Sequence, residues 1–182
     1  VIDSIERQAQ GRPVIAMGHS LGGLLSFMAA YRRPELMQQL IMLDPPLING
    51  FPSLGIHLAK LFNQKYVDKL TPAGISAYRR DHWDNREDAA AKLRPKGLFS
   101  TFDQQCFDDY IRYGLSDDPI NGGVTLTIPK MAEVEIFRTN PSLFWLKPRQ
   151  APKVPVKMVV GQDSLFIKRG FPQRVKRMLG IE

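Results

Sequence analysis

The chain has 182 residues and a formal net charge of +7, with 43% hydrophobic and 24% charged residues. This length predicts one domain with enough apolar material for a buried core. No run approaches about 18 consecutive apolar residues, so we expect no membrane-spanning helix. The single cysteine, Cys106, excludes an internal disulfide and a cysteine-based metal site, and we expect its thiol to pack in the core. This cysteine usage and the absence of a leader favour a reducing, cytoplasmic location.

The positive charge is spread along the chain rather than gathered in one stripe. Basic residues come as separate pairs at 32–33, 79–80, 168–169 and 176–177. A nucleic-acid-binding protein concentrates such charge on one face, together with aromatic side chains. We therefore expect these pairs to lie on solvated surfaces, and we expect no nucleic-acid partner.

Both ends of the chain read as amphipathic helices. Ile2, Ile5 and Ala9 recur at helical spacing, and Gly11 is a typical residue for the end of that helix. A second helical pattern covers 171–179, with Gly180 as its expected cap. Because the first pattern is already under way at residue 1, we interpret the sequence as a fragment of a longer protein.

Three short apolar runs predict buried parallel strands. The first is "PVIAM" at 13–17, followed by an amphipathic helix that stops before Pro34. The other two strands are "QLIML" at 39–43 and "VPVKMVV" at 154–160. Strand, helix and strand joined by short turns predict an α/β fold, with a parallel sheet and crossover helices.

The segment between the second and third strands is predicted to be mainly helical. We expect one helix near 56–62, another at 85–93 capped by Asn85, and a third at 101–115. Thr101 and Gln104 match a capping box for the third helix. The predicted organisation is a core at 1–48, a helical lid at 49–150 and a second core segment at 151–182.

The motif Gly18-His19-Ser20-Leu21-Gly22 fits G-x-S-x-G, between an apolar strand and an amphipathic helix. In this context the motif predicts a nucleophile elbow, a sharp turn that presents the serine hydroxyl at the end of the strand. We expect a Cβ at Gly18 or Gly22 to collide with the neighbouring strand and helix. The Leu21 N–H is placed to face a developing oxyanion. A glycine-rich turn without chemistry is the alternative.

At these residues the sequence resembles the α/β-hydrolase superfamily. "VIAMGHSLGG" looks like the central strand and elbow of its serine esterases, lipases and thioesterases. "LIMLDPP" is similar to the next strand and "VPVKMVVGQDS" to the strand before the catalytic acid. The resemblance implies a lid at the position of the insertion, and a triad in the chain order serine, acid, histidine.

Two aspartates are candidates for the triad acid. Asp163 follows the third strand, in the place where the superfamily usually carries its acid, and is the preferred assignment. Asp44 follows the strand after the elbow and is the alternative. Each can also serve only to form a turn, since aspartate is common there.

The histidine that the triad needs has no good candidate in the chain. His19 lies inside the elbow, where we expect it to point away from Ser20 and to pack or form hydrogen bonds. His57 and His82 lie in the insertion, ahead of Asp163. The resemblance places the base beyond Glu182, so we expect the printed segment alone to be inactive and, with both outer strands lacking partners, to fold poorly.

The resulting functional prediction is a serine hydrolase that cleaves carboxylic esters through an acyl-enzyme on Ser20. We expect no cofactor and no metal, because no phosphate-binding loop or metal-ligand cluster occurs. An acyltransferase and a non-catalytic binding protein of the same fold are the alternatives. A small-molecule ester with an apolar acyl chain is the expected substrate. The apolar lid residues are expected to form mostly the lid's own core, with a few lining the acyl pocket: Phe51, Leu54, Leu58, Phe62, Trp83, Phe99, Phe107 and Tyr110.

Overall fold

The computed structural model describes residues 1–146 and 151–180 of the chain. Its contacts divide the chain into two units. Unit 1 comprises Val1–Leu61 and Asn140–Glu182, and unit 2 comprises Phe62–Thr139. Unit 2 lies inside the segment that we expect to be a lid. Its role as a lid stays a prediction.

Unit 1 is an α/β unit. Helix α1 is followed by alternating strands and helices, and the chain returns to this unit after residue 139. The elements are α1 (Ile2–Ala9), β1 (Val14–His19), α2 (Leu21–Arg32), η1 (Pro34–Leu36), β2 (Met37–Leu43), α3 (Gly50–Phe62), η3 (Phe144–Leu146), β6 (Val156–Val159), α9 (Leu165–Lys168) and α10 (Phe171–Leu179).

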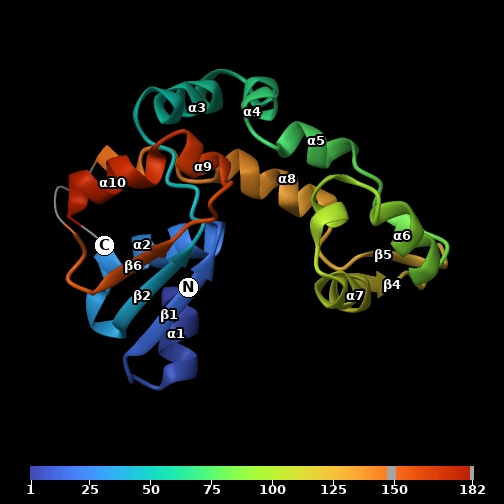
Figure 1. Ribbon diagram of the computed structural model, residues 1–182, viewed down its shortest axis with the longest axis horizontal. Coiled ribbons are helices and arrows are strands. Elements are labelled where there is room, and N and C mark those ends of the chain that lie inside the picture. Colours follow the sequence, from blue (N-terminus) through green and yellow to red (C-terminus); the bar gives the residue numbers. More distant parts are fainter. Residues whose placement is uncertain (147–150, 181–182) are drawn as a thin grey trace. The chain divides into compact units, whose positions relative to one another are not determined.

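The three strands form one parallel sheet in the order β1-β2-β6 (Figure 1). The pairing register places His19 beside Leu43, and Leu43 beside Val159, so the three strands end at one edge. All three predicted strands are confirmed, and so is the parallel α/β architecture. The predicted helices at the two ends are confirmed as α1 and α10.

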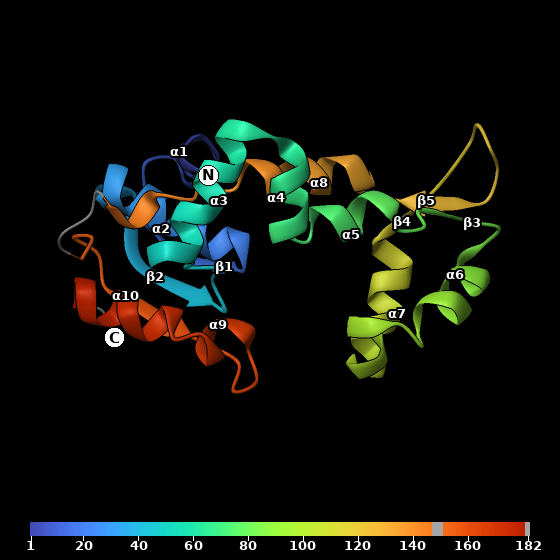
Figure 2. The ribbon, with the colours of Figure 1, turned by 90° about the horizontal axis from the view of Figure 1, so that it is seen from above.

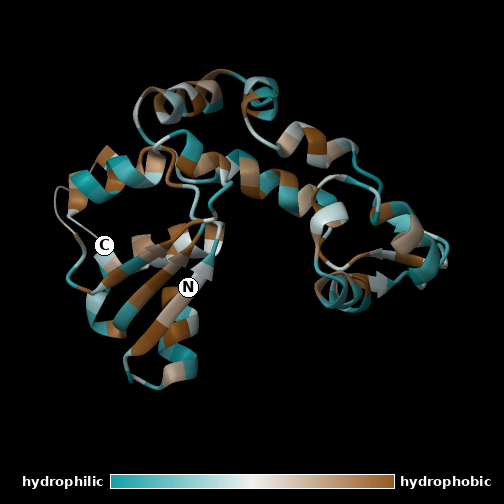
Figure 3. Ribbon diagram, in the orientation of Figure 1, coloured by the Kyte–Doolittle hydropathy of each residue, from teal (hydrophilic) through white to brown (hydrophobic). Residues whose placement is uncertain are grey.

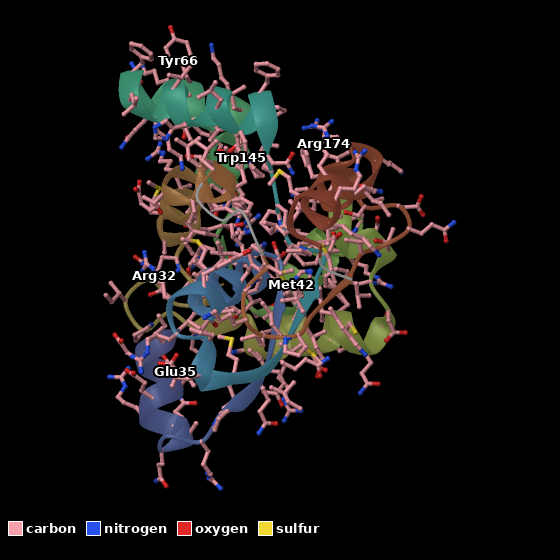
Figure 4. The ribbon with its side chains drawn as sticks, turned by 90° about the vertical axis from the view of Figure 1, so that its left-hand side faces the viewer. Arg32, Glu35, Met42, Tyr66, Trp145 and Arg174 are labelled. Carbon is pink, nitrogen blue, oxygen red and sulfur yellow. The ribbon has the colours of Figure 1, made fainter. Side chains whose placement is uncertain are left out.

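One face of this sheet is covered and the other is open. The covered face contributes to a core with α2 and α10, which includes Leu24, Leu40, Met42 and Val175, each almost fully buried. Figure 4 shows Met42 among packed side chains and Arg174 at the periphery of α10. Strand side chains alternate between faces, so neighbouring positions differ sharply in exposure.

On the open face the side chains of β1 and β6 are accessible. Ile15 is 60% exposed, Met17 is 63% exposed and Val159 is 56% exposed, whereas Ala16 between the first two is buried. The hydropathy colouring shows these strands as mostly apolar (Figure 3). Their near-continuous apolar composition is typical of a parallel sheet covered on both faces.

Unit 2 combines five helices with a small antiparallel sheet, in the order β3-β5-β4 (Figure 2). The sheet adds strands to a segment that the sequence predicts as mainly helical. The elements wholly inside this unit are α4 (Gln64–Leu70), α5 (Ala73–Tyr78), β3 (His82–Trp83), α6 (Arg86–Leu93), η2 (Gly97–Thr101), α7 (Gln104–Tyr113), β4 (Leu115–Asp117), β5 (Val124–Leu126) and α8 (Lys130–Thr139).

A core of its own holds unit 2 together. Trp83, 1% exposed, packs with Leu115, Val124 and other apolar side chains of the small sheet and of α6. The Arg138 guanidinium of α8 donates two hydrogen bonds of 2.8 Å to the carboxylate of Asp68 in α4. This bidentate pair holds the pKa of the Asp68 carboxyl below its usual range. The pair fixes α4 against α8.

Two local sequence predictions are wrong, although the predicted Asn85 cap is confirmed. Helix α7 begins at Gln104 and is capped by Asp103, whose side chain accepts from the Gln105 amide 2.9 Å away. Thr101 instead ends the short η2 helix and donates to the Leu98 carbonyl. Cys106 is exposed rather than packed in the core, because the buried position of α7 is taken by its neighbour Phe107.

The apolar residues expected in the core of the lid divide into two groups. Trp83 and Phe107 are buried, as expected, while Phe51 and Phe62 are 89% and 78% exposed. Leu54 and Leu58, which recur with Phe51 at helical spacing along α3, are also exposed. Helical spacing predicts which residues share a face, but not whether another element covers that face. Within the described ranges no helix is long and apolar enough to cross a membrane.

Candidate active site

Ser20 lies at the junction of β1 and α2 with a strained backbone. Its φ is 49° and its ψ is −122°, a conformation that residues with a side chain rarely adopt. Such a residue costs on the order of 1–3 kcal/mol and persists where the surrounding structure holds it in place. Here the Ser20 N–H donates to the Leu43 carbonyl of the paired strand, at 2.9 Å. The turn is therefore held by the sheet itself.

The hydroxyl of Ser20 is not used to cap the helix that follows. A serine at this position usually accepts a hydrogen bond from an amide of the first turn, but Ser20 makes no such bond. Ser20 is half-buried, and the structure shows no hydrogen-bond partner for its side chain within residues 1–146 or 151–180. The Leu21 amide belongs to the first turn of α2, where N–H groups have no partner inside the helix.

The glycines around Ser20 do not share one role. A Cβ on Gly18 would lie 2.5 Å from the Gly22 carbonyl oxygen and from the Gly23 nitrogen. A Cβ on Gly23 would lie 2.8 Å from the Gly18 carbonyl oxygen, whereas a Cβ on Gly22 meets nothing within 4 Å. The prediction that Gly22 is required sterically is therefore wrong. Gly23, one residue later, makes the close approach between helix and strand.

These distances predict different effects for two matched substitutions. Gly18→Ala is expected to lower the free energy of unfolding by about 3 kcal/mol, because the new methyl group overlaps backbone atoms that cannot move aside. Gly22→Ala is expected to be neutral or to raise it by about 0.5–1 kcal/mol, since alanine favours a helix over glycine. Urea unfolding followed by circular dichroism measures both. Equal effects would contradict the steric assignment.

Asp44 follows β2 directly and sits beside Ser20 in the sheet register. The pair His19–Leu43 is the last of the β1–β2 ladder, so Ser20 and Asp44 are the next residues on neighbouring strands. Asp44 has a φ of 43°, and its N–H donates to the Val159 carbonyl at 2.7 Å. Its Oδ1 is buried with no hydrogen-bond partner among the described residues. A buried carboxylate oxygen without a donor is costly unless another group reaches it.

Asp163 has a different environment. It follows β6 after a short turn, and its side chain is 94% exposed. Its carboxylate lies 3.4 Å from the Lys168 ammonium, an ion pair in full contact with solvent. Exposed pairs of this kind contribute little to stability. Both candidates for the acid therefore lie near the carboxyl edge of the sheet, but only Asp44 has a buried, unpartnered oxygen.

None of the three histidines is placed against Ser20 by a contact that the structure shows. His19 is exposed and has no hydrogen bond within the described residues, so the packing or bonding role expected for it is not found. The Nδ1 of His57 lies 3.3 Å from the Ser142 hydroxyl, and the Nε2 of His82 lies 2.6 Å from the Gly122 carbonyl. One ring nitrogen of each of these two residues thus has a partner other than Ser20.

The described residues offer no group of three or more His, Cys, Asp and Glu side chains arranged to hold a metal ion. Asp44 and Asp163 are the acidic residues that follow the strands of the parallel sheet. Neither belongs to a group of three such side chains among the described residues, so their chemistry suits orientation of a base better than ligation of a cation.

Asn49 is a residue of the site region that the sequence analysis did not single out. It is 2% exposed, and its Nδ2 donates to the Leu47 carbonyl at 2.9 Å and to the Phe171 carbonyl at 3.2 Å. These bonds attach the loop that follows Asp44 to the start of α10. An asparagine in the otherwise apolar stretch "PPLING" is the signal that could have indicated it, because buried amides are nearly always bonded.

Curated relatives resemble part of the chain. A type I acyl-CoA thioesterase, mpaH, of Penicillium roqueforti is 31% identical over 62% of this chain and 24% of its own length. The mpaH of Penicillium brevicompactum is 28% identical over 70% of the chain and 32% of its own length. The abhydrolase domain-containing protein AFT2-1 of Alternaria alternata is 30% identical over 59% and 35%. The chain spans about a quarter to a third of the length of these relatives.

Solved structures share the fold at low sequence identity. A thioesterase domain from the curacin biosynthetic pathway aligns over 98% of the chain and 61% of its own length, with a TM-score of 0.67 and 18% identity. The peroxisomal α/β-hydrolase Lpx1 of Saccharomyces cerevisiae aligns over 91% and 44%, with a TM-score of 0.61 and 16% identity. No protein-family profile matches the chain. The chain nevertheless has the α/β-hydrolase fold and is related to thioesterases and abhydrolase-domain proteins.

Proposed function

We propose that the protein carrying this chain is a serine hydrolase that cleaves acyl thioesters or oxygen esters through an acyl-enzyme on Ser20. The observation that carries the proposal is the strained backbone of Ser20 at the strand–helix junction, with its hydroxyl free of a capping bond. A strained backbone at a residue whose side chain forms no local hydrogen bond is typical of a catalytic position. The relationship to hydrolases supports the same assignment.

The proposed reaction has two steps. The Ser20 Oγ attacks the carbonyl carbon while a histidine base takes the hydroxyl proton, and the base then protonates the leaving thiol or alcohol. Water next attacks the acyl carbon and gives a proton to the same base. The base then returns that proton to the Ser20 Oγ as the bond between Oγ and the acyl carbon breaks, which releases the acid and restores Ser20. The Leu21 N–H donates to the oxyanion of both tetrahedral intermediates. We propose that the base comes from the whole protein outside the described residues.

We propose Asp44 as the triad acid, in preference to Asp163. Asp44 is in register with Ser20 across the paired strands, and its Oδ1 is buried and lacks a donor within the described part of the chain. An imidazole N–H would supply that donor, and a carboxylate in this position holds the base in the productive tautomer. Asp163, exposed and paired with Lys168, has no comparable unfilled site.

An acyl thioester is the favoured substrate class. The two Penicillium relatives are described as acyl-CoA thioesterases, and the curacin-pathway neighbour is described as a thioesterase domain. Thioesters and oxygen esters pass through the same oxyanion, so the geometry around Ser20 suits both. We propose an apolar acyl group on this thioester.

A fluorophosphonate probe tests the proposed function in the whole protein. A fluorophosphonate forms a stable phosphorus–oxygen bond only to a serine activated by a working base, with loss of fluoride. We expect one labelled site, on the peptide that contains Ser20, and no labelling of Ser20→Ala. Folded protein that remains unlabelled would favour the alternative of a non-catalytic binding protein. Product analysis with water and an alcohol as competing acceptors then separates hydrolysis from acyl transfer.

A further inference from the structure

Unit 2 contains a cavity of about 390 Å³ that is built entirely from its own elements. Residues of α5, β3, α6, η2, α7 and β5 line it. Small-molecule sites in proteins usually measure about 300–1,000 Å³ and combine an apolar wall with a few polar groups. The cavity has the size of such a site, and neither the sequence motif at Ser20 nor the comparisons assign it a role.

The wall of the cavity is apolar and in part rigid. Trp83 and Leu126 are 1% and 6% exposed and belong to the core of the unit. Phe99 packs against Tyr110 with ring centroids 4.7 Å apart. Toward the solvent, Ile75, Tyr78 and Leu98 are 80%, 92% and 69% exposed, although they line the same cavity. Apolar side chains that stay open to solvent beside a buried aromatic wall suit an apolar ligand group.

The polar groups of the cavity are cationic. Arg79, Arg80 and Lys96 line it, and no acidic residue does so among the described residues. Arg79 pairs with Glu133 through Nη1 at 2.9 Å, yet its Nε is buried without a hydrogen-bond partner among those residues. Arg80 donates to the His82 carbonyl through Nε. A buried guanidinium N–H that lacks an acceptor favours an anion at this position.

Two further groups complete the polar side. Lys96 is exposed, and the described residues provide no ion pair for its ammonium group. The Tyr110 hydroxyl forms a hydrogen bond with the Arg79 side chain, and burial raises the pKa of this phenol although Arg79 lowers it in part. The acid nearest to Arg80 is Asp88, at 3.7 Å, and it is shared with Lys92 at 2.7 Å. The cavity therefore retains an excess of positive charge.

We propose that this cavity binds a small amphipathic organic anion. The apolar body of the ligand packs against Trp83, Phe99 and Leu126, and its carboxylate or phosphate group lies between Arg79 and Lys96. The proposal does not depend on Ser20 or on the reaction proposed above, because every residue it uses belongs to unit 2.

Binding of octanoate, octyl phosphate, octanol and inorganic phosphate to the whole protein that carries this chain tests the proposal. The protein carries Ser20→Ala to exclude chemistry, and isothermal titration calorimetry measures each affinity. We expect saturable binding of octanoate or octyl phosphate, and the tighter of these two identifies the head group. Octanol and inorganic phosphate are each expected to bind at least about tenfold more weakly. Octanol lacks the anionic group, and inorganic phosphate lacks the apolar chain.

Matched variants locate the anion. Lys96→Gln and Arg79→Gln are expected to weaken binding of the anionic ligand about tenfold, as for a charge-assisted hydrogen bond. Lys65→Gln removes the same charge from an exposed position of unit 2 outside the cavity and is expected to change affinity less than about twofold. Lys96 is exposed, so its variant keeps the test valid if Arg79→Gln unfolds. Absence of saturable binding, equal affinity for octanol, or an equal effect of Lys65→Gln would overturn the proposal.

Discussion

Replacement of Ser20 by alanine in the whole protein is expected to lower kcat for an acyl thioester by on the order of 10⁴- to 10⁶-fold. The Ser20 side chain is the proposed nucleophile. The next serine along the chain, Ser26, is buried inside α2 and cannot replace it at the end of β1. Its removal takes away the covalent route while leaving the fold in place. Single-turnover kinetics with a chromogenic thiol leaving group measure the loss.

A structural control accompanies this variant. Alanine at position 20 keeps the backbone strain but loses the hydroxyl. The free energy of unfolding, measured with urea, should therefore change by less than about 1 kcal/mol. Ser26, which is buried in α2, provides a second serine-to-alanine substitution that leaves the junction intact. If Ser20→Ala retained more than a few per cent of the activity, the acyl-enzyme mechanism would be wrong.

Asp44→Asn is expected to lower kcat by on the order of 10⁴-fold, because an amide in place of the carboxylate favours the wrong tautomer of the base. The loss follows from the environment of Asp44, whose buried Oδ1 lacks a donor among the described residues. The pH–rate profile of the remaining activity should also change, since the base loses the charge that stabilises its protonated form.

Asp163→Asn is the matched comparison, with the same change of one oxygen to nitrogen. We expect it to alter kcat by less than about threefold, since an exposed ion pair such as that with Lys168 contributes little. The opposite outcome, a large loss for Asp163→Asn and a small one for Asp44→Asn, would assign the acid to Asp163 and refute the role proposed for Asp44.

Most of unit 1 could be predicted from the sequence. Each of its strands is a short apolar run between turn signals, and Ser20 is marked by small neighbours at a strand–helix boundary. These are local patterns, and local patterns are what a sequence expresses directly. The same is true of the Asn85 cap and of the glycine at the end of α10.

The errors arise where the outcome depends on contacts distant in sequence. The steric need falls on Gly23 rather than Gly22, because it depends on where the helix crosses the Gly18 carbonyl. Phe51 and Phe62 have the spacing of a buried stripe but lie in solvent, since no described element covers them. The small sheet of unit 2 was missed because strands of two or three residues are too short to show alternation.

The hydrogen bonds at the carboxyl edge of the parallel sheet connect three strand ends in series. Ser20 N–H bonds to the Leu43 carbonyl, and the next residue, Asp44, bonds through its N–H to Val159. A single opening of the end of β2 therefore exposes both amides at once. In hydrogen-exchange measurements the amide protons of Ser20 and Asp44 should therefore exchange in one cooperative opening event. The backbone hydrogen bonds of the two residues are expected to form and break together.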